Sequence, residues 1–537
     1  MSLCALSAEL LLCVTSNLQK QDLLNLSLTC KHLRHASEPE LFREYTNISR
    51  RGHSFLPFLR RIILQPDLSK HVRKLHLRAW TTLLIVTDNG LTSEGILRQY
   101  SKQRDIRGVR GTQMTEADRV LLIQAARNAG VIEELASLDG SSCNPGGVHK
   151  ATCAIPLSPI PRGTSASDRT FCERLRAGCE DPLVSLLIAL LPNVRDIVLD
   201  GVPSDIHALI WQPKHGFSAL RTLTACAAEG ALQWPLDFFQ PLLVWGKLRI
   251  LKASHATSGR LQLTRRESMT PELPPLVLLP EKLALERVEL ENCCLRASDL
   301  QPLLRSCSGL RNFLYTSRRR EAAPFSPSPA EFVELLKPLQ NTLEGLILDV
   351  EVHRNEGKTD DKLALIHSLA HMTALKVLVT TPEMWRSGTV EDATTNNHKD
   401  GSGEQRLSVR IPPNVETLVF GMSEAEKTTS PSQLSDVVRT RTAMLPNLTN
   451  LSVGGIDSAY VQAIKQLYLD LDSFASAGPR KLHAEIGPIY VRSVFDATQL
   501  SHTGNEVRWT ERMYTTSPTE DSLFARAYER IRRGLPR

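Results

Sequence analysis

The residues best suited to chemistry in this sequence do not form a recognisable catalytic motif. His367 and His371 stand four residues apart on an expected helix, a spacing that can bind a metal ion. No HExxH glutamate accompanies them, so we favour outward-facing or helix-end histidines. The stretch GTSAS at 163–167 lacks the second glycine of a nucleophile elbow, and the sequence has neither a P-loop nor a dinucleotide-binding glycine motif. We therefore predict no catalytic residues, no metal ligands and no cofactor, and a protein that is not an enzyme.

The composition is typical of a globular protein in a reducing compartment. The 537 residues are 42% hydrophobic and 23% charged but only 5% aromatic, so small and branched aliphatic residues must supply most of the core. Eleven cysteines occur without CxxC pairs, which argues against a disulfide framework. No stretch approaches the ~20 apolar residues that span a bilayer. The leucine-rich start has no basic leader and contains Glu9, so we expect a cytoplasmic or nuclear protein without membrane contact.

Positive charge is concentrated near the N-terminus. Residues 1–78 contain twelve Lys or Arg and six Asp or Glu, which accounts for the whole net charge of +6. A basic region of this kind can bind nucleic acid. We favour the solvated face of a small helical domain, because aromatic residues do not interleave with the basic ones and no groove-reading motif occurs. The sequence therefore predicts no nucleic-acid partner.

Three short helices are predicted at the N-terminus. Ser7 can cap the first helix, on which Leu10 and Leu18 share one face. Asp22 can cap the second helix, and a third covers about 30–37. Three helices within about 40 residues bury little by themselves, so their apolar excess is expected to face a partner. The alternative is that this segment caps the domain that follows.

The order of these residues resembles an F-box over about residues 3–45. The resemblance lies in LSAELL at 6–11, Leu18, DLLNLSLTCKHLR at 22–34 and PELFR at 39–43. Serine stands at position 7, where the family usually has the proline that pre-sets entry into the helix. In that family the three helices interlock with the Skp adaptor, which binds the cullin scaffold. The resemblance implies that the adaptor-binding residues are Leu6, Ser7, Glu9, Leu10, Leu18, Asp22, Leu23, Leu26, Cys30, Lys31 and Leu33.

A second pattern, apolar-x-x-apolar-x-apolar, recurs ten times further along the chain. It begins at positions 72, 194, 220, 248, 285, 310, 343, 375, 415 and 448. Leucine-rich repeats have such a strand core, and its last two apolar positions alternate as in a strand with one buried face. Helical segments precede several units, including those at 183–190, 299–307, 331–339 and 363–371. The spacing is irregular, and an ordinary α/β domain is the alternative.

We therefore predict an α/β repeat fold, with a small N-terminal three-helix F-box followed by an irregular leucine-rich-repeat-like solenoid. Helices would lie outside and strands inside. The predicted domains are an F-box-like domain at 1–48, a linker helix, first repeat unit and insertion at 49–115, the solenoid at 116–470, and a C-terminal cap with a basic helix at 471–537. A helix is also expected at 116–136, between insertions at 81–115 and 139–182. Arginines 318–320 could bind phosphate, although a solvated loop is the favoured interpretation.

The resemblance and the repeats together predict a substrate-recognition adaptor of a Skp–cullin–F-box E3 ubiquitin ligase, similar to F-box proteins of the fungal type. The F-box would dock on the Skp adaptor and through it on a cullin–RING ligase, while the solenoid binds a protein target. The alternative is a non-catalytic repeat scaffold for protein–protein interaction, in which the F-box-like segment is only a cap.

Overall fold

The computed structural model describes parts of the chain that fall into two compact units. The first unit is chiefly Met1–Trp234, and the second includes Leu248–Arg260 and Thr270–Arg537. The described residues are 3–47, 55–78, 114–132, 171–172, 175, 180–200, 217–226, 234–239, 243, 247–258, 283–317, 326–350, 365–381, 384–385, 406–420, 431–453 and 483–486.

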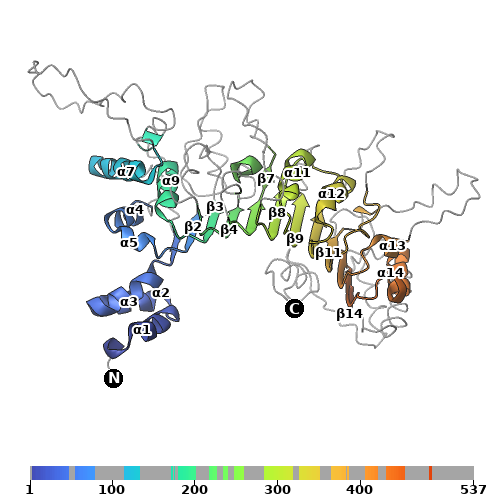
Figure 1. The fold of residues 1–537 in the computed structure, drawn as a ribbon, viewed down its shortest axis with the longest axis horizontal. Helices are drawn as coiled ribbons and strands as arrows, with labels where there is room; N and C mark the ends of the chain where they lie inside the picture. The colour runs from blue at the N-terminus through green and yellow to red at the C-terminus, as the bar shows by residue number, and fades with distance from the viewer. Residues whose placement is uncertain are drawn as a thin grey trace, which may run out of the picture. The chain divides into compact units, whose positions relative to one another are not determined.

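The first unit combines short helices with four strands (Figure 1). Its helices are η1 (Leu3–Ala5), α1 (Ala8–Ser16), α2 (Lys20–Thr29), α3 (Lys31–Leu41), α4 (Phe55–Leu64), α5 (Pro66–Ser69), α7 (Glu116–Ala129) and α9 (Asp181–Leu190). Its strands are β1 (Glu44–Thr46), β2 (Lys74–Arg78), β3 (Asp196–Asp200) and β4 (Thr222–Cys226).

The second unit contains most of the strands. Its helices are η3 (Leu236–Phe239), α11 (Ala297–Arg305), α12 (Pro329–Leu336), η4 (Lys337–Leu339), α13 (Leu407–Arg410) and α14 (Pro431–Met444). Its strands are β6 (Ile250–Ser254), β7 (Ala256–Thr257), β8 (Arg287–Cys293), β9 (Asn312–Ser317), β10 (Gly345–Asp349), β11 (Val377–Thr380), β12 (Thr417–Phe420), β13 (Asn450–Val453) and β14 (His483–Ile486). The two-residue strand β5 (Trp234–Pro235) precedes them in the chain.

The four strands of the first unit run parallel in the order β1-β2-β3-β4. Alternate side chains are buried, as the sequence pattern requires: Leu75 pairs with Ile197, which pairs with Leu223, and all three are fully buried. The alternate positions of β3 and β4 are half-exposed, and most of them are polar, such as Asp196, Asp200 and Thr224. Helix α9 contacts both α4 and α7, so these helices supply the apolar layer of this unit.

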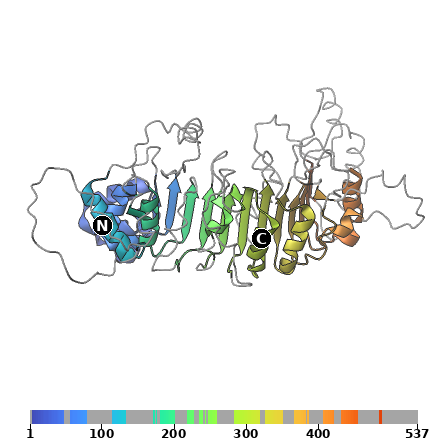
Figure 2. The same ribbon diagram turned by 90° about the horizontal axis from the view of Figure 1, so that it is seen from above.

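The second unit holds a longer parallel sheet in the order β6-β8-β9-β10-β11-β12-β13-β14. Figure 2 shows its strands side by side, and Figure 1 shows α11 and α12 on one side of them. The opposite side is apolar as well, because Leu314, Ile347, Val379 and Val419 form a second buried cluster across β9–β12. Strands β9–β12 are therefore buried on both faces, as is typical of parallel sheets.

One backbone connection repeats between almost all neighbouring strands within each unit. The carbonyl of the residue that precedes a strand accepts two N–H groups, one from the residue just before the next strand and one from the first residue of that strand. The carbonyl oxygen of Arg43 accepts from the amides of Arg73 (2.8 Å) and Lys74 (3.0 Å), and that of Arg73 accepts from Arg195 (2.7 Å) and Asp196 (3.1 Å). In the second unit the same arrangement recurs from Arg249, Glu286, Arg311, Glu344, Lys376 and Glu416. The first residues of neighbouring strands are therefore aligned in the same way at each of these steps.

All ten strands predicted from the recurring pattern are present. The weakest positions of the pattern, Ala225, Ala253 and Thr380, are buried like the leucines they replace. The predicted helices at 183–190, 299–307 and 331–339 correspond to α9, α11, and α12 with η4. The N-terminal helices thus precede an α/β arrangement with parallel strands.

The helix predicted at 363–371 is wrong for its described residues. The amide of Ile366 donates to the carbonyl of Met384 (2.7 Å), and the amide of Leu369 donates to the carbonyl of Arg410 (2.8 Å). These two amides are therefore bonded to distant carbonyls and are not available for a helical ladder within the segment. Consequently His367 and His371 do not share a helical face.

One further prediction is partly confirmed, and several others concern residues outside the described parts of the chain. The helix expected at 116–136 ends at Ala129, because Gly130 adopts a left-handed conformation (φ 74°) that closes it. The insertions at 81–115 and 139–182 lie almost wholly, and the C-terminal helix and arginines 318–320 entirely, outside the described residues. Among the described residues, no helix is both long enough and apolar enough to cross a membrane.

Asp118 joins α7 to α4 and offers a test of the first unit. Its carboxylate accepts hydrogen bonds from Arg60 and from the hydroxyl (2.6 Å) and amide (3.1 Å) of Thr115. The Arg60 hydrogen bond is the main cause that lowers the pKa of the buried Asp118 carboxyl to about 2. We expect Asp118→Asn to reduce the free energy of unfolding by about 2 kcal/mol at pH 7.

The pH dependence of this loss follows from the direction of the pKa shift. Because the folded pKa lies below the unfolded value of 3.8, the stabilisation is complete above about pH 4 and disappears as the pH falls towards 2. Urea unfolding of both proteins at pH 7 and pH 3 should therefore show a difference that shrinks at the lower pH. An equal difference at both pH values would mean that the charge of Asp118 is not its cause.

Candidate partner-binding site

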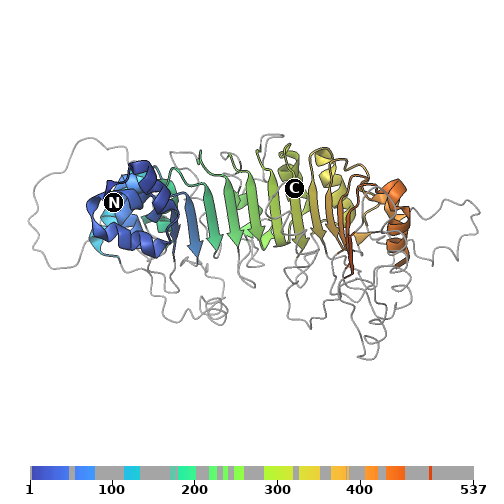
Figure 3. The same ribbon diagram turned by 90° about the horizontal axis from the view of Figure 1, so that it is seen from below.

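The three N-terminal helices form a small domain, which we call the hook (residues 3–41; Figure 3). Helix α1 begins after Ser7, as predicted, but the Ser7 hydroxyl does not cap the helix amides. The amide of Glu9 and the Ser7 hydroxyl instead lower the pKa of the Glu9 carboxyl. Helix α2 begins at Lys20, so Asp22 lies in its first turn and is not its cap. Both carboxylates still favour the helices through the macrodipole.

The third helix is longer than the predicted 30–37. Cys30 is its N-terminal cap, and the amide of Leu33 donates to the Cys30 sulfur at 3.5 Å. The helix continues to Leu41, so Pro39 lies inside it and does not end it. A proline inside a helix removes one backbone hydrogen bond, and its place near the end limits that cost.

The core of the hook is thin. Each helix contributes one buried leucine and, four residues later, one buried Ser or Thr: Leu11 with Thr15, Leu23 with Ser27, and Leu33 with Ser37. The three hydroxyls donate to backbone carbonyls three residues earlier in their own helices, at 3.1, 2.7 and 3.0 Å. Their polar atoms are thus satisfied, and the helices pack through small side chains. Three leucines are a small core for three helices.

Most other leucines of the hook are exposed to solvent. Leu28 exposes 69% of its surface and Leu10 exposes 55%. The described residues include ten exposed large hydrophobic side chains, and six of them lie in the hook: Leu3, Leu10, Leu12, Val14, Leu24 and Leu28. Such a concentration of exposed apolar side chains on one small domain indicates a surface that a partner covers.

The predicted adaptor-binding residues divide into two groups. Leu23 and Leu33 are buried in the hook core (4% and 5% exposed), so they hold the helices together and do not contact a partner directly. The others are exposed or half-buried: Leu6, Ser7, Glu9, Leu10, Leu18, Asp22, Leu26, Cys30 and Lys31. The predicted set lacks the exposed residues Leu3, Leu12, Leu24 and Leu28. The spacing of Leu24 and Leu28, one helical turn apart, could have indicated a second apolar face on α2.

Strand β1 fixes the hook to the sheet of the first unit. It pairs with β2, and Tyr45 stacks on Phe58 of α4 with ring centroids 3.8 Å apart. The Lys20 ammonium donates to the Glu44 carbonyl at 3.1 Å. The buried amide of Asn47 exchanges two hydrogen bonds with the backbone of Arg78. The chain just after the hook is therefore held rigidly, while the exposed leucines of the hook are not used for this attachment.

The described residues contain no group of three or more His, Cys, Asp or Glu that could hold a metal ion. The chemistry this site offers is apolar burial, worth about 25 cal/mol per Å² of surface removed from water.

A thin helical domain with apolar side chains beyond its own core has the properties of a protein-docking module. A family model described as F-box-like matches residues 8–47. The chain therefore carries an F-box-like domain, and F-box domains generally bind the Skp adaptor of cullin–RING ligases. The match starts after Leu6 and Ser7 and ends at Asn47, so it includes β1 as well as the hook helices. No curated protein matches the chain.

Proposed function

We propose that this protein is the substrate-recognition adaptor of a Skp–cullin–F-box E3 ubiquitin ligase, related to F-box proteins of the fungal type. The exposed apolar surface of the hook, within a segment that matches the F-box-like model, is the observation that carries this proposal. Exposed leucines such as Leu10 and Leu28 are costly in water, and their burial against the adaptor would supply the affinity.

The proposed mechanism is proximity. The hook docks on the Skp adaptor, and the rest of the chain holds a protein target near the charged ubiquitin-conjugating enzyme, which raises the effective concentration of a target lysine. The attachment through β1, Tyr45 and Asn47 supports this mechanism, because it limits the motion between the hook and the sheet of the same unit. On this proposal no residue of the chain makes or breaks a covalent bond, and the protein needs no cofactor.

We further infer that the parallel strands belong to a leucine-rich-repeat-like solenoid and that a protein target binds to it. The recurring strand pattern and the repeated backbone connection support this inference. On β2–β4 the half-exposed side chains include His76, Asp200 and Thr224, a polar surface suited to specific contacts with a protein. The reduced cysteines of such a chain fit a cytoplasmic or nuclear location.

The alternative of a repeat scaffold with the hook as a mere cap is less favoured. A cap would bury its apolar face against the neighbouring sheet, whereas Leu10, Leu24 and Leu28 are exposed. The contact with the sheet is made by the short segment from Phe42 to Asn47.

Co-purification with a Skp adaptor tests the proposal. The full chain should be captured stoichiometrically, and a chain without residues 1–41 should not. Deletion must stop there, because Phe42 stacks near Phe58 and Asn47 anchors Arg78, so both belong to the folded remainder. Circular dichroism of the shortened chain should show that the remainder stays folded. Failure of the intact chain to bind any Skp adaptor would refute the proposed function.

A further inference from the structure

Two cysteines of the hook lie side by side at its surface. The Cys4 and Cys30 sulfur atoms are 3.7 Å apart, although 26 positions separate these residues in the sequence. Both side chains are exposed, whereas Cys293 and Cys307 are buried in the second unit. A disulfide bond is about 2.05 Å long, so rotation of two exposed side chains has to close a gap of only about 1.7 Å. The two thiols are therefore close enough to form a disulfide bond after a small rotation of their side chains.

The surroundings of Cys30 make it the more reactive member of the pair. Its sulfur is the N-terminal cap of α3 and accepts the amide of Leu33 at 3.5 Å. This amide, and to a lesser extent the Cys4 thiol, lower the pKa of the Cys30 thiol because they stabilise the thiolate. A thiolate at the beginning of a helix is the usual setting of a redox-active cysteine.

We infer that Cys4 and Cys30 form a reversible disulfide under peroxide stress and that this bridge controls docking of the hook on its adaptor. The first part stands on the geometry alone, and the second rests on the proposed function.

The reaction is balanced with hydrogen peroxide as the oxidant. The Cys30 thiolate attacks one peroxide oxygen, the O–O bond breaks, and Cys30 becomes a sulfenic acid while hydroxide leaves. The Cys4 sulfur then attacks the Cys30 sulfur, the S–O bond breaks, and water leaves with the proton of the Cys4 thiol. Two thiols have lost two electrons in total, and the peroxide has been reduced to two waters. A dithiol reductant reverses the bridge.

The position of the pair explains why the bridge would affect docking. Cys4 follows the exposed Leu3 in η1, and Cys30 comes two residues after the exposed Leu28. A bridge fixes η1 against the start of α3 and withdraws the Cys30 sulfur from the predicted contact set. An adaptor that contacts the Cys30 sulfur or separates η1 from the start of α3 loses that contact or that freedom in the bridged form, so we expect about tenfold weaker binding of the oxidised form.

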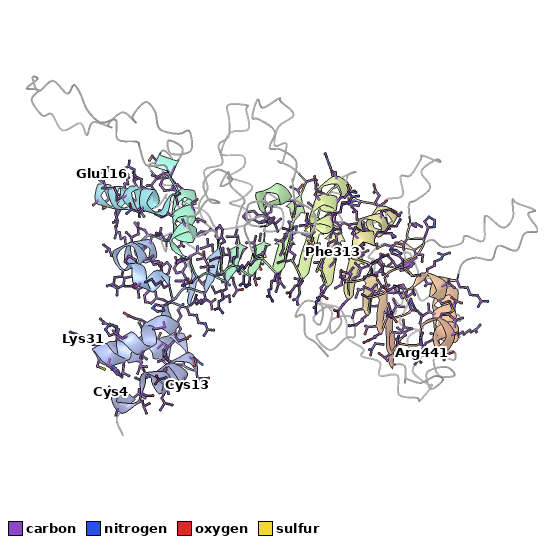
Figure 4. The ribbon with its side chains drawn as sticks, viewed as in Figure 1. Cys4, Cys13, Lys31, Glu116, Phe313 and Arg441 are labelled. Atoms are coloured by element: carbon purple, nitrogen blue, oxygen red, sulfur yellow. The ribbon has the colours of Figure 1, made fainter. Side chains whose placement is uncertain are left out.

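Peptide mapping of the full chain after hydrogen peroxide treatment tests the first part. A Cys4–Cys30 linked peptide, two mass units lighter than the sum of its reduced parts, should appear and disappear again with dithiothreitol. Cys13, an exposed cysteine on α1 of the same hook, provides the matched control (Figure 4). The link should persist in Cys13→Ser and be absent in Cys4→Ser. Oxidation without this link would overturn the inference.

Adaptor binding by the oxidised and reduced proteins tests the second part. Oxidation should weaken binding about tenfold in the natural protein and in Cys13→Ser, but not in Cys4→Ser. Equal binding of a fully linked protein would overturn the control of docking while leaving the dithiol intact. Absence of binding by the reduced natural protein would refute the proposed F-box function instead. The linked peptide would then be the test of whether Cys4 and Cys30 form a reversible disulfide.

Discussion

Replacement of Leu10 by aspartate and of Leu28 by lysine is expected to weaken capture by the Skp adaptor about 100-fold or more, without unfolding the protein. Both side chains are mostly exposed, so their loss costs the hook little packing. Leu10 lies in the first turn of α1, where an acidic residue favours the helix, and Leu28 lies in the last turn of α2, where a basic residue does. Isothermal titration with a Skp adaptor measures the loss, and thermal unfolding measures the fold.

Two matched controls distinguish this surface from exposed apolar residues in general. Leu64, at the end of α4, has the same exposed fraction as Leu28 (69%), and Val120 of α7 exposes 61%. Leu64→Lys and Val120→Asp should therefore leave adaptor binding unchanged. Leu23→Asp makes the opposite contrast, because it places a charge in the thin core and should unfold the hook as well as abolish binding. Similar weakening by the Leu64 or Val120 variants would contradict a docking surface on the hook.

The hook could be predicted from sequence because its residues follow the order and spacing typical of an F-box. Which of its apolar side chains are exposed could not be predicted. Helix α2 carries Leu23, Leu24, Leu26 and Leu28, which spread over more than half of its circumference. Only the packing of the three helices decides that Leu23 turns inward against the other two buried leucines. Helical spacing therefore located the docking segment, whereas the choice between support and contact required tertiary structure.

The strands were predictable for a different reason. Their alternating apolar positions are imposed by a core on at least one face, and this requirement even places Ala225 and Thr380 inward. The edge strand β1 was missed because its three residues, Glu44–Thr46, owe their conformation to pairing with β2 and not to a pattern of their own. The wrongly predicted helix near Ile366 fails similarly, since distant carbonyls take its amides. Tertiary hydrogen bonds override local periodicity at such positions.

Loss of the ion pair between Lys252 and Glu289 is expected to destabilise the second unit strongly. The Lys252 ammonium lies 2.8 Å from a Glu289 carboxylate oxygen on the neighbouring strand, where the two residues are paired in register. Glu289 is buried, and Arg287 lies 3.7 Å from its other oxygen. We expect Lys252→Met to lower the free energy of unfolding by about 3 kcal/mol at pH 7, because a buried carboxylate then keeps only the more distant arginine.

The pH dependence of this loss has a definite sign. Burial raises the pKa of the Glu289 carboxyl, so its charged form is the one that the fold disfavours once Lys252 is gone. The loss should be complete above the raised folded pKa and should diminish as the pH falls and the carboxyl takes up a proton. Urea unfolding at pH 7 and pH 5 should therefore show a smaller difference at pH 5. Lys252→Met combined with Glu289→Gln should recover most of the stability, because the buried charge is removed while an acceptor for Arg287 remains. A double variant as unstable as Lys252→Met alone would show that lost packing of the lysine stem, and not the unpaired carboxylate, causes the destabilisation.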